Sequence, residues 1–398
     1  MRRFAALALV LVAGCNWGPE YKLPPPSTSR LPSASDAPNY ARLNDVAFQL
    51  AEAMELGSGG NEVVSPLSVS HNLALVLNGS STSAHDELMR LFDVTEEDRK
   101  AFNESQRALL NRLDELDGRP LRVGAALFTV WPLPLDPGYI SRMGAIYGAT
   151  AENLGGSGIE AKRLVDQWVR ESTDGAITEV VDDIDKSEEL LLVNVAYFTA
   201  KWERPFDPIR SYRGEFAGSA REASFMSQSG EAECYAGDAF KAVRLPYRGG
   251  EFAFIAMLPG EGRDAGGLLN KNLWSELNEG FVKQDANIVL PKFAFGAEHD
   301  LKPAIEQLGV PSLFNESCNL RPMSIELESG YRFSRMVHKA LVRVDEEGTT
   351  AASVTISAVE GGEKGEGAFE FVADRPFAFA IVDVKTGVIC FLGVVSAP

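Results

Sequence analysis

Histidine is scarce in this sequence: the 398 residues contain four, at positions 71, 85, 299 and 338. A hydrolase of the serine or cysteine type needs a nucleophile with an oriented base, and histidine is the usual base. The sequence also has no Gly-x-Ser-x-Gly or His-Glu-x-x-His motif. These absences indicate that the protein is not an enzyme.

Cysteine is equally rare and has no metal-like spacing. Beyond Cys15, which lies in the N-terminal segment, there are only Cys234, Cys318 and Cys390. Three widely separated cysteines allow one disulfide at most. We therefore predict buried or free thiols, no metal site and no cofactor.

Positive charge is in deficit, with 38 Lys and Arg against 56 Asp and Glu and a formal net charge of −18. The basic residues are scattered rather than clustered. This balance argues against nucleic acid, an anionic membrane surface or a glycosaminoglycan as partner. The remaining composition, 45% hydrophobic, is that of a globular protein with a sizeable core.

The first fifteen residues have the pattern of an export signal. Arg2 and Arg3 precede an apolar run, 4–12, that is too short to span a bilayer. The ending Leu-Val-Ala-Gly-Cys15 resembles a bacterial lipobox, in which the cysteine receives a lipid. An ordinary secretory signal with an incidental cysteine is the alternative. Cys15 is thus the expected lipid attachment site, the only contact with a membrane.

The predicted destination is accordingly outside the cytoplasm. We expect either a lipoprotein of the outer membrane, on its periplasmic face or at the cell surface, or an extracellular protein. Residues 16–38 contain six prolines with Ser and Thr between them, which is typical of a semi-extended tether. The folded domain is predicted over 39–398, without repeats or an internal boundary, and a monomer is expected.

Within that domain the sequence shows both helical and strand patterns. Amphipathic or apolar helical patterns cover 44–56, 84–91, 137–147, 159–170 and 301–308. Strand patterns cover 121–129, 149–154, 243–247, 252–259, 287–295 and 388–395. The run Glu189–Lys201 is almost wholly apolar, as in a central strand that is covered on both faces.

The stretch that follows Val344 combines two features that rarely occur together. Thr349 to Val359 is uncharged and rich in small and β-branched residues, which favours a strand. Its alternate residues, from Thr349 onward, are small enough to slide between existing strands without overpacking a core. Glu360–Gly367, with the sequence EGGEKGEG, cannot bury apolar surface and is expected to be exposed.

This stretch closely resembles the proximal hinge of the serpins. The hinge residues are Glu346, Glu347, Gly348, Thr349, Thr350, Ala351 and Ala352. His338-Lys339-Ala340 before them and Asp374-Arg375-Pro376-Phe377 after them are similar to the family's flanks. The segments at 65–68, 189–206, 258–262 and 290–293 also resemble serpin motifs, so the likeness covers about 39–398. Departures are Ala200, where the family usually has Gly, and the segments 79–82 and 318–324.

The resemblance implies a fold and an arrangement of residues. The expected fold is of the α+β class and has a large mixed central sheet, two smaller sheets, about eight or nine helices and an exposed reactive-centre loop. Ser65, Ser68, Asn194 and His338 would form a polar cluster under the main sheet, where the sheet parts. A satisfied core histidine is the general alternative for His338. Trp202 would lie at the top of the sheet.

The resemblance also implies a function, inhibition of a serine-type endopeptidase by a suicide mechanism. The protease would cleave the exposed tip, and the freed strand would insert into the main sheet. Two alternatives stay open: inhibition of a cysteine protease by the same mechanism, and a non-inhibitory serpin-like binding or chaperone module. The small inserting face favours an inhibitor. No residue of this chain would be catalytic.

The scissile bond is expected between Glu360 and Glu366, but two ways of counting disagree. Counting from Glu346, as in typical serpins, places it after Gly362, between Gly362 and Glu363. Counting back from Pro376 places it near residue 365. Gly362 suits a small or permissive specificity pocket, Lys364 a trypsin-like pocket, and Glu360 or Glu363 a glutamate-specific protease. We rank Gly362 first, then Lys364, then Glu360.

Overall fold

A computed structural model describes residues 30–220, 222–349 and 368–398. The predicted export signal with Cys15, most of the tether, and the segment 350–367 lie outside these residues. In the described part of the chain, none of the helices has the length and apolar character needed to cross a membrane.

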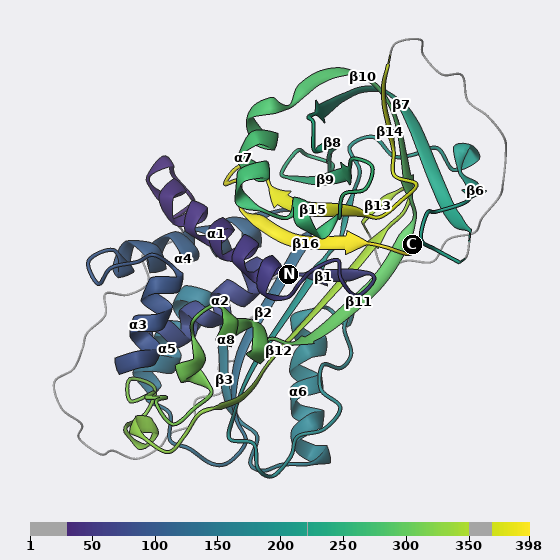
Figure 1. Cartoon of the computed structure of the whole chain (residues 1–398). Coiled ribbons are helices and arrows are strands. Elements are labelled where there is room, and N and C mark those ends of the chain that lie inside the picture. The colour runs from purple at the N-terminus through teal and green to yellow at the C-terminus, as the bar shows by residue number, and fades with distance from the viewer. Residues whose placement is uncertain (1–29, 221, 350–367) are drawn as a thin grey trace, which may run out of the picture.

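Helices gather mainly on one side of the molecule (Figure 1). The described residues contain eight α-helices: α1 (Ala37–Ala53), α2 (Pro66–Leu77), α3 (Thr82–Leu91), α4 (Arg99–Glu115), α5 (Pro137–Tyr147), α6 (Ile159–Ser172), α7 (Lys271–Gly280) and α8 (Lys302–Gln307). Local sequence explains where several of them begin. Helix α2, for example, has Pro66 at its first position, and the Ser65 side chain caps it by accepting a hydrogen bond from Ser68 N.

The main sheet is mixed and has seven strands. Its order is β3 (Thr150–Asn153), β2 (Leu121–Thr129), β4 (Leu190–Phe198), β12 (Phe333–Val344), β13 (Gly348–Thr349) and β5 (Ala200–Lys201), with β11 (Phe293–Asp300) also paired to β12. Strands β2 and β4 are antiparallel, whereas β4 and β12 are parallel. The predicted large mixed sheet is therefore confirmed.

The remaining strands form one hydrogen-bonded ladder of nine. Its order is β1 (Glu62–Val64), β16 (Ile389–Val395), β15 (Phe377–Asp383), β9 (Phe252–Pro259), β8 (Phe240–Pro246), β7 (Ala223–Ala236), β10 (Val282–Pro291) and β14 (Phe369–Val372), with β6 (Tyr212–Gly214) paired to β7. The two smaller sheets of the prediction correspond to the two ends of this ladder. They are joined because the C-terminal end of β7 pairs with β8.

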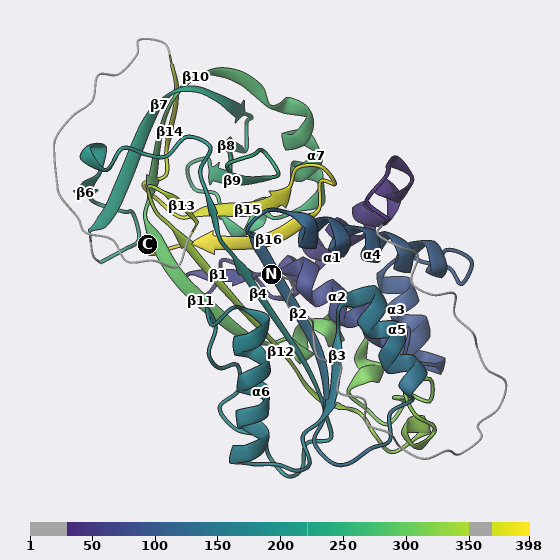
Figure 2. The same ribbon diagram turned by 180° about the vertical axis from the view of Figure 1, so that it is seen from behind.

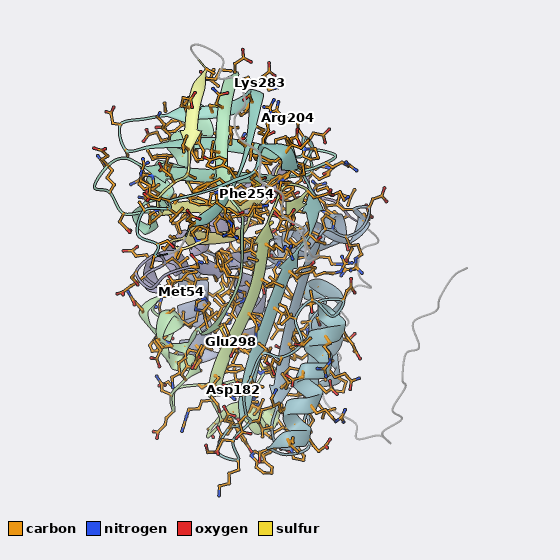
Figure 3. The ribbon with its side chains drawn as sticks, turned by 90° about the vertical axis from the view of Figure 1, so that its right-hand side faces the viewer. Met54, Asp182, Arg204, Phe254, Lys283 and Glu298 are labelled. Carbon is orange, nitrogen blue, oxygen red and sulfur yellow. The ribbon has the colours of Figure 1, made fainter. Side chains whose placement is uncertain are left out.

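The main sheet is covered on both faces, which explains the unbroken apolar run of β4. Alternate residues Leu190, Leu192 and Ala196 belong to the large core that α2 shares. The intervening residues of β4, Leu191 and Val193, belong to a smaller core beneath α6. Figures 2 and 3 show α6 lying along the lower part of the main sheet. Since side chains alternate along a strand, a strand buried on both faces has no polar periodicity.

The folded part begins earlier than the predicted boundary at Asn39. Helix α1 starts at Ala37, and a 3-10 turn, Ala34–Asp36, precedes it. Arg30 is tied to the buried carboxylate of Asp36 at 2.6 Å. The C-terminal end of the predicted tether is therefore part of the domain, because its Ser33 and Asp36 form a reciprocal cap before α1.

Three elements, α4, α7 and β7, were not predicted from the sequence. Helix α4 buries Phe102, Leu109 and Leu113, which recur at helical spacing along an otherwise charged segment. The apolar spacing indicates a helix, but the many charged residues of the segment make this spacing hard to recognise in the sequence.

Candidate functional site: the hinge and the seam of the main sheet

The feature around which the site is built is the junction of β4 and β12, called the seam below. Residues Phe333–Leu341 of β12 pair in parallel with Leu190–Tyr197 of β4. His338 lies directly opposite Asn194 in this register. Parallel ladders are slightly less stable per residue than antiparallel ones. The centre of the sheet is thus held by one of its weaker pairings.

The structure brings Ser65, Ser68, Asn194 and His338 together beneath the seam. Ser65 N donates to His338 Nε2 at 3.0 Å, and Ser68 Oγ donates to Asn194 Oδ1 at 3.0 Å. His338 Nδ1 also lies within hydrogen-bond distance of Asn194 Oδ1. Because Nε2 accepts, the neutral ring carries its proton on Nδ1 and donates it to Asn194. The start of α2 is therefore bonded to both strands of the seam.

All four cluster side chains are fully buried. Burial, reinforced by His299 on β11, lowers the pKa of His338 to about 3. A protonated ring could no longer accept from Ser65 N. The cluster is consequently stable only with neutral His338, and acidification acts against it.

Two residues of the hinge, Gly348 and Thr349, are already paired in the main sheet as β13. After the corner at 345–347, β13 pairs antiparallel with β12, Thr349 opposite Val344, and antiparallel with β5, Thr349 opposite Ala200. A Cβ on Gly348 would lie 2.1 Å from the carbonyl oxygen of Ala200, so glycine is required for this close approach. Strand β13 lies at the upper end of the seam, between β12 on one side and β5 on the other.

Trp202 holds the hinge from the side. Its indole Nε1 donates to the carbonyl oxygen of Asp345 at 2.9 Å, and its backbone N donates to Glu347 O at 2.9 Å. The indole ring stacks on Tyr247, with centroids 4.6 Å apart. The Tyr247 hydroxyl is 2.6 Å from the hydroxyl of Thr349, which is fully buried. This places the side chain of Thr349 on the core face of the sheet.

A buried ion pair fixes the first hinge residue. The carboxylate of Glu346 accepts from Lys292 Nζ and from Ser211 Oγ, both at 2.6 Å. Burial by itself raises the pKa of Glu346, but these hydrogen bonds outweigh it and leave the pKa below its ordinary value. The hinge is therefore anchored to the bend between β10 and β11.

Glu346 and Trp202 were predicted from the sequence, whereas their partners Lys292, Ser211 and Tyr247 were not. A family-like turn at 290–293 was the one available signal for Lys292. The other hinge residues, Thr350, Ala351 and Ala352, lie outside the described residues. So do all scissile-bond candidates, Glu360, Gly362, Glu363 and Lys364.

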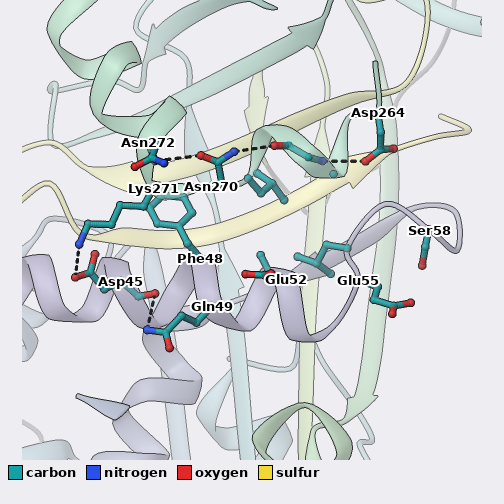
Figure 4. Close-up of a pocket in the computed structure, with 15 residues that line it drawn as sticks. Asp45, Phe48, Gln49, Glu52, Glu55, Ser58, Asp264, Asn270, Lys271 and Asn272 are labelled. Carbon is teal, nitrogen blue, oxygen red and sulfur yellow. Dashed lines mark hydrogen bonds and ion pairs between the residues drawn. The ribbon is translucent and has the colours of Figure 1, made fainter. Parts of the chain in front are cut away.

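Away from the seam, a groove lies between α1 and the segment that leads into α7 (Figure 4). This groove has a volume of about 840 Å³. Its floor is apolar, with Phe48, Leu56 and Leu269 almost fully buried. Lys271 bridges it by an ion pair with Asp45 at 2.7 Å.

The cysteines contribute no chemistry to the seam. Cys234, Cys318 and Cys390 are free and buried. Burial raises the pKa of Cys318 to about 12, so its thiol is unreactive at neutral pH.

Together these features define a class of protein: a two-sheet α+β fold with a parallel seam at the centre of its main sheet and a tightly held hinge above it. The family model for serpins, serine protease inhibitors, matches residues 41–398. The chain belongs to the serpin family.

Individual relatives agree with this assignment. The plasma serine protease inhibitor of Bos taurus is 28% identical over 383 residues, covering 92% of this chain and 92% of the relative. The serine protease inhibitor 42Dd of Drosophila melanogaster is 29% identical over 347 residues, covering 85% and 91%.

Solved structures show the same fold. The native state of the thermophilic serpin tengpin has a TM-score of 0.82 at 19% identity, covering 94% of this chain and 97% of tengpin. Human thyroxine-binding globulin complexed with thyroxine has a TM-score of 0.79 at 21% identity, covering 91% and 98%.

Proposed function

We propose that this serpin inhibits a serine-type endopeptidase as a suicide substrate, by cleavage of the loop after Thr349 and insertion of the freed strand into the seam. Serpins are themselves an established example of strand addition to a sheet. The observation that carries the proposal for this chain is β13, because its pairing with both β12 and β5 sets the path of any strand that continues it.

The register of β13 supports the proposal from two sides. On β12, six residues separate Val344 from His338, and in an antiparallel continuation six residues separate Thr349 from Thr355. On the other side, six residues separate Ala200 from Asn194. Both counts place Thr355 between His338 and Asn194, in agreement with the register of the β4–β12 pair. Insertion would thus separate His338 from Asn194 and place the small hydroxyl side chain of Thr355 between them.

The length of the seam also matches the sequence. The same register brings Leu190, at the lower end of β4, opposite Val359. The uncharged run ends at Val359. The seam can therefore take up the whole run while the charged tip stays outside, which agrees with a scissile bond between Glu360 and Glu366.

The chemistry belongs to the target protease. Its nucleophile attacks the carbonyl carbon of the scissile bond, the new amino terminus leaves, and an acyl-enzyme ester remains. Insertion then replaces one parallel pairing with two antiparallel ones, and the tethered protease is carried away before water can hydrolyse the ester. A cysteine protease would form a thioester in the same way.

A non-inhibitory binding module remains the second candidate, and the groove of Figure 4 is the observation in its favour. One solved relative is described as complexed with thyroxine, which shows that the fold can serve as a binding protein. The groove's apolar floor suits a small organic ligand. The anchored hinge and the matching seam favour inhibition.

Titration against a panel of proteases separates the two candidates. We expect an SDS-resistant complex with a serine protease at a stoichiometry near one, and cleaved protein with a higher melting temperature than intact protein. Mass spectrometry of the released C-terminal fragment then identifies the bond. A fragment that begins at Glu363, Gly365 or Gly361 indicates Gly362, Lys364 or Glu360 respectively. Rapid cleavage by every protease, with no complex and equal melting temperatures, would refute inhibition.

We further propose that Cys15 carries lipid and anchors the inhibitor at a membrane, with the tether holding the domain off the surface. The support is the lipobox-like ending and the proline-rich segment that follows. Metabolic labelling with palmitate should be lost in Cys15→Ala. Retained label in that variant would assign the lipid elsewhere.

A further inference from the structure

Three large apolar side chains are exposed at the lower end of the main sheet, opposite to the hinge. Trp131, Ile159 and Ile325 are 43%, 82% and 55% exposed. Trp131 lies two residues beyond the end of β2, and that end pairs with Leu190, the first residue of β4. The hinge pairs with Ala200, beyond the last residue of β4. Strand β4 therefore separates these side chains from the hinge.

Hydrogen bonds join Trp131 to the start of α6 through one loop. The Trp131 indole N–H donates to the carbonyl oxygen of Lys186 at 3.3 Å, which fixes the ring while much of it stays exposed. In the same loop, the carbonyl oxygen of Ile184 accepts from the backbone N of Gly158 at 2.8 Å. Gly158 directly precedes Ile159, so both exposed side chains belong to one part of the surface.

The segment 131–136, with the sequence WPLPLD, turns its prolines outward. Its two leucines are half-buried and pack against the large core, whereas the two prolines that alternate with them are exposed. Ser324 Oγ donates to the carbonyl oxygen of Pro134 at 2.6 Å, which keeps the next residue, Ile325, close to these prolines. The exposed apolar side chains, called the lower surface below, are those of Trp131, Pro132, Pro134, Ile159 and Ile325.

The surroundings of the lower surface are acidic. The segments 131–136, 182–186 and 321–328 contain six acidic and two basic residues, and one of the basic residues, Arg321, is paired with Glu328 at 3.1 Å. Asp182, labelled at this end of the molecule in Figure 3, is exposed together with Asp183 and Asp185. An apolar centre with a polar rim is typical of protein interfaces, and tryptophan is enriched among their strongest contacts.

Charge selects among the possible occupants of such a surface. The acidic rim repels nucleic acid and anionic membranes. It also repels a second copy of a chain whose formal net charge is −18. The occupant that is complementary in both respects is a polypeptide with apolar side chains on one side and Lys or Arg on the other.

We propose that the lower surface binds a cationic amphipathic segment of a partner protein. Its apolar side packs on Trp131 and Ile325, and its basic side chains face the aspartates of 182–185. A partner at this site leaves the hinge free, because the two lie at opposite ends of β4. The inference therefore does not rest on the proposed inhibitory function.

Two synthetic helical peptides of equal length are the probes, one built from Leu and Lys and the other from Leu and Glu. Fluorescence anisotropy of the labelled peptides measures their binding to the full chain. We expect the Leu/Lys peptide to bind and the Leu/Glu peptide not to bind. Trp131→Ser should weaken binding about tenfold. Asp182→Asn combined with Asp183→Asn should weaken it more at low than at physiological ionic strength.

The chain offers a matched control at its other end. Tyr212 on β6 is 39% exposed, close to the value for Trp131, and it follows Ser211, which binds the hinge residue Glu346. Tyr212→Ser should leave the affinity for the Leu/Lys peptide unchanged.

Several outcomes would overturn the inference. Equal affinity of the wild type and Trp131→Ser for the Leu/Lys peptide would show that the peptide responds only to net charge. Equal losses in Trp131→Ser and Tyr212→Ser would show that the site is not the lower surface. Binding to phosphatidylcholine vesicles in place of the peptide, lost in Trp131→Ser, would assign the surface to lipid. A dimer in analytical ultracentrifugation that Trp131→Ser abolishes would assign it to a second copy of the chain.

Discussion

Replacing His338 by glutamine should make the protein less sensitive to acid. In the folded state His338 is neutral, with a pKa of about 3, because it is buried and accepts a hydrogen bond from Ser65 N. In the unfolded chain its pKa is about 6.5. The unfolded state therefore binds more protons below pH 6.5, so stability is complete above that value and falls as the pH drops toward 3.

The size of the effect follows from these two values. Between pH 7 and pH 5, protonation of the unfolded state costs the folded state about 2 kcal/mol through this one residue. Glutamine can accept from Ser65 and donate to Asn194 but does not titrate in this range. Between pH 7 and pH 5, the free energy of unfolding of His338→Gln should therefore fall by about 2 kcal/mol less than that of the wild type. His71, whose pKa burial lowers to about 4, adds an equal slope to both proteins.

Urea unfolding at pH 7, 6 and 5 measures the effect, with constant ionic strength and matched m values. Equal pH slopes for wild type and His338→Gln would show that His338 is not held neutral by the cluster. The reasoning about the seam would then be wrong.

Three further changes test the hinge. Thr349→Arg should turn the inhibitor into a substrate, since an unpaired charge would be buried in the sheet; an unchanged stoichiometry of inhibition would contradict this. Gly348→Ala should expel β13 from the sheet, because its Cβ would collide with the Ala200 carbonyl, and limited proteolysis should then cut the hinge faster than in the wild type. Lys292→Met should destabilise the protein by about 2–4 kcal/mol in urea unfolding, because it leaves the Glu346 carboxylate buried without its cation. Adding Glu346→Gln should recover most of that loss, and strictly additive effects would show that the pair is not coupled.

Much of the fold could be predicted from the sequence where local pattern decides structure. The ranges 121–129 and 137–147 match β2 and α5, because alternation and helical spacing are strong there. The seam could not be read in this way. Its key contacts join residues far apart in the chain, such as Ser65 with His338 and Lys292 with Glu346. No local periodicity records such pairs, and only the family likeness indicated the first of them.

The side chain of Asn72 on α2 shows a second limit of prediction from the sequence. The sequence shows an asparagine inside an apolar helix, but not whether its amide has a partner. That distinction depends on the packing of α2 against the sheet. In the structure the Ser68 hydroxyl bonds to Asn194, whereas the amide of Asn72, one helical turn further on, has no hydrogen-bond partner among the described residues.

Under the proposed mechanism, the pairing of Gly348 and Thr349 in β13 means that insertion extends an existing strand and does not start a new one. A strand that had to find its slot from solution would first lose the entropy of closing a long loop. Here the first ladder bonds exist before the protease arrives, so the pairing frame is fixed in advance. A slip by one residue would turn Val354 and Ile356 toward the space that accepts small hydroxyl side chains. Gly348 and Thr349 would thus set the register of the inserting strand before its other residues pair.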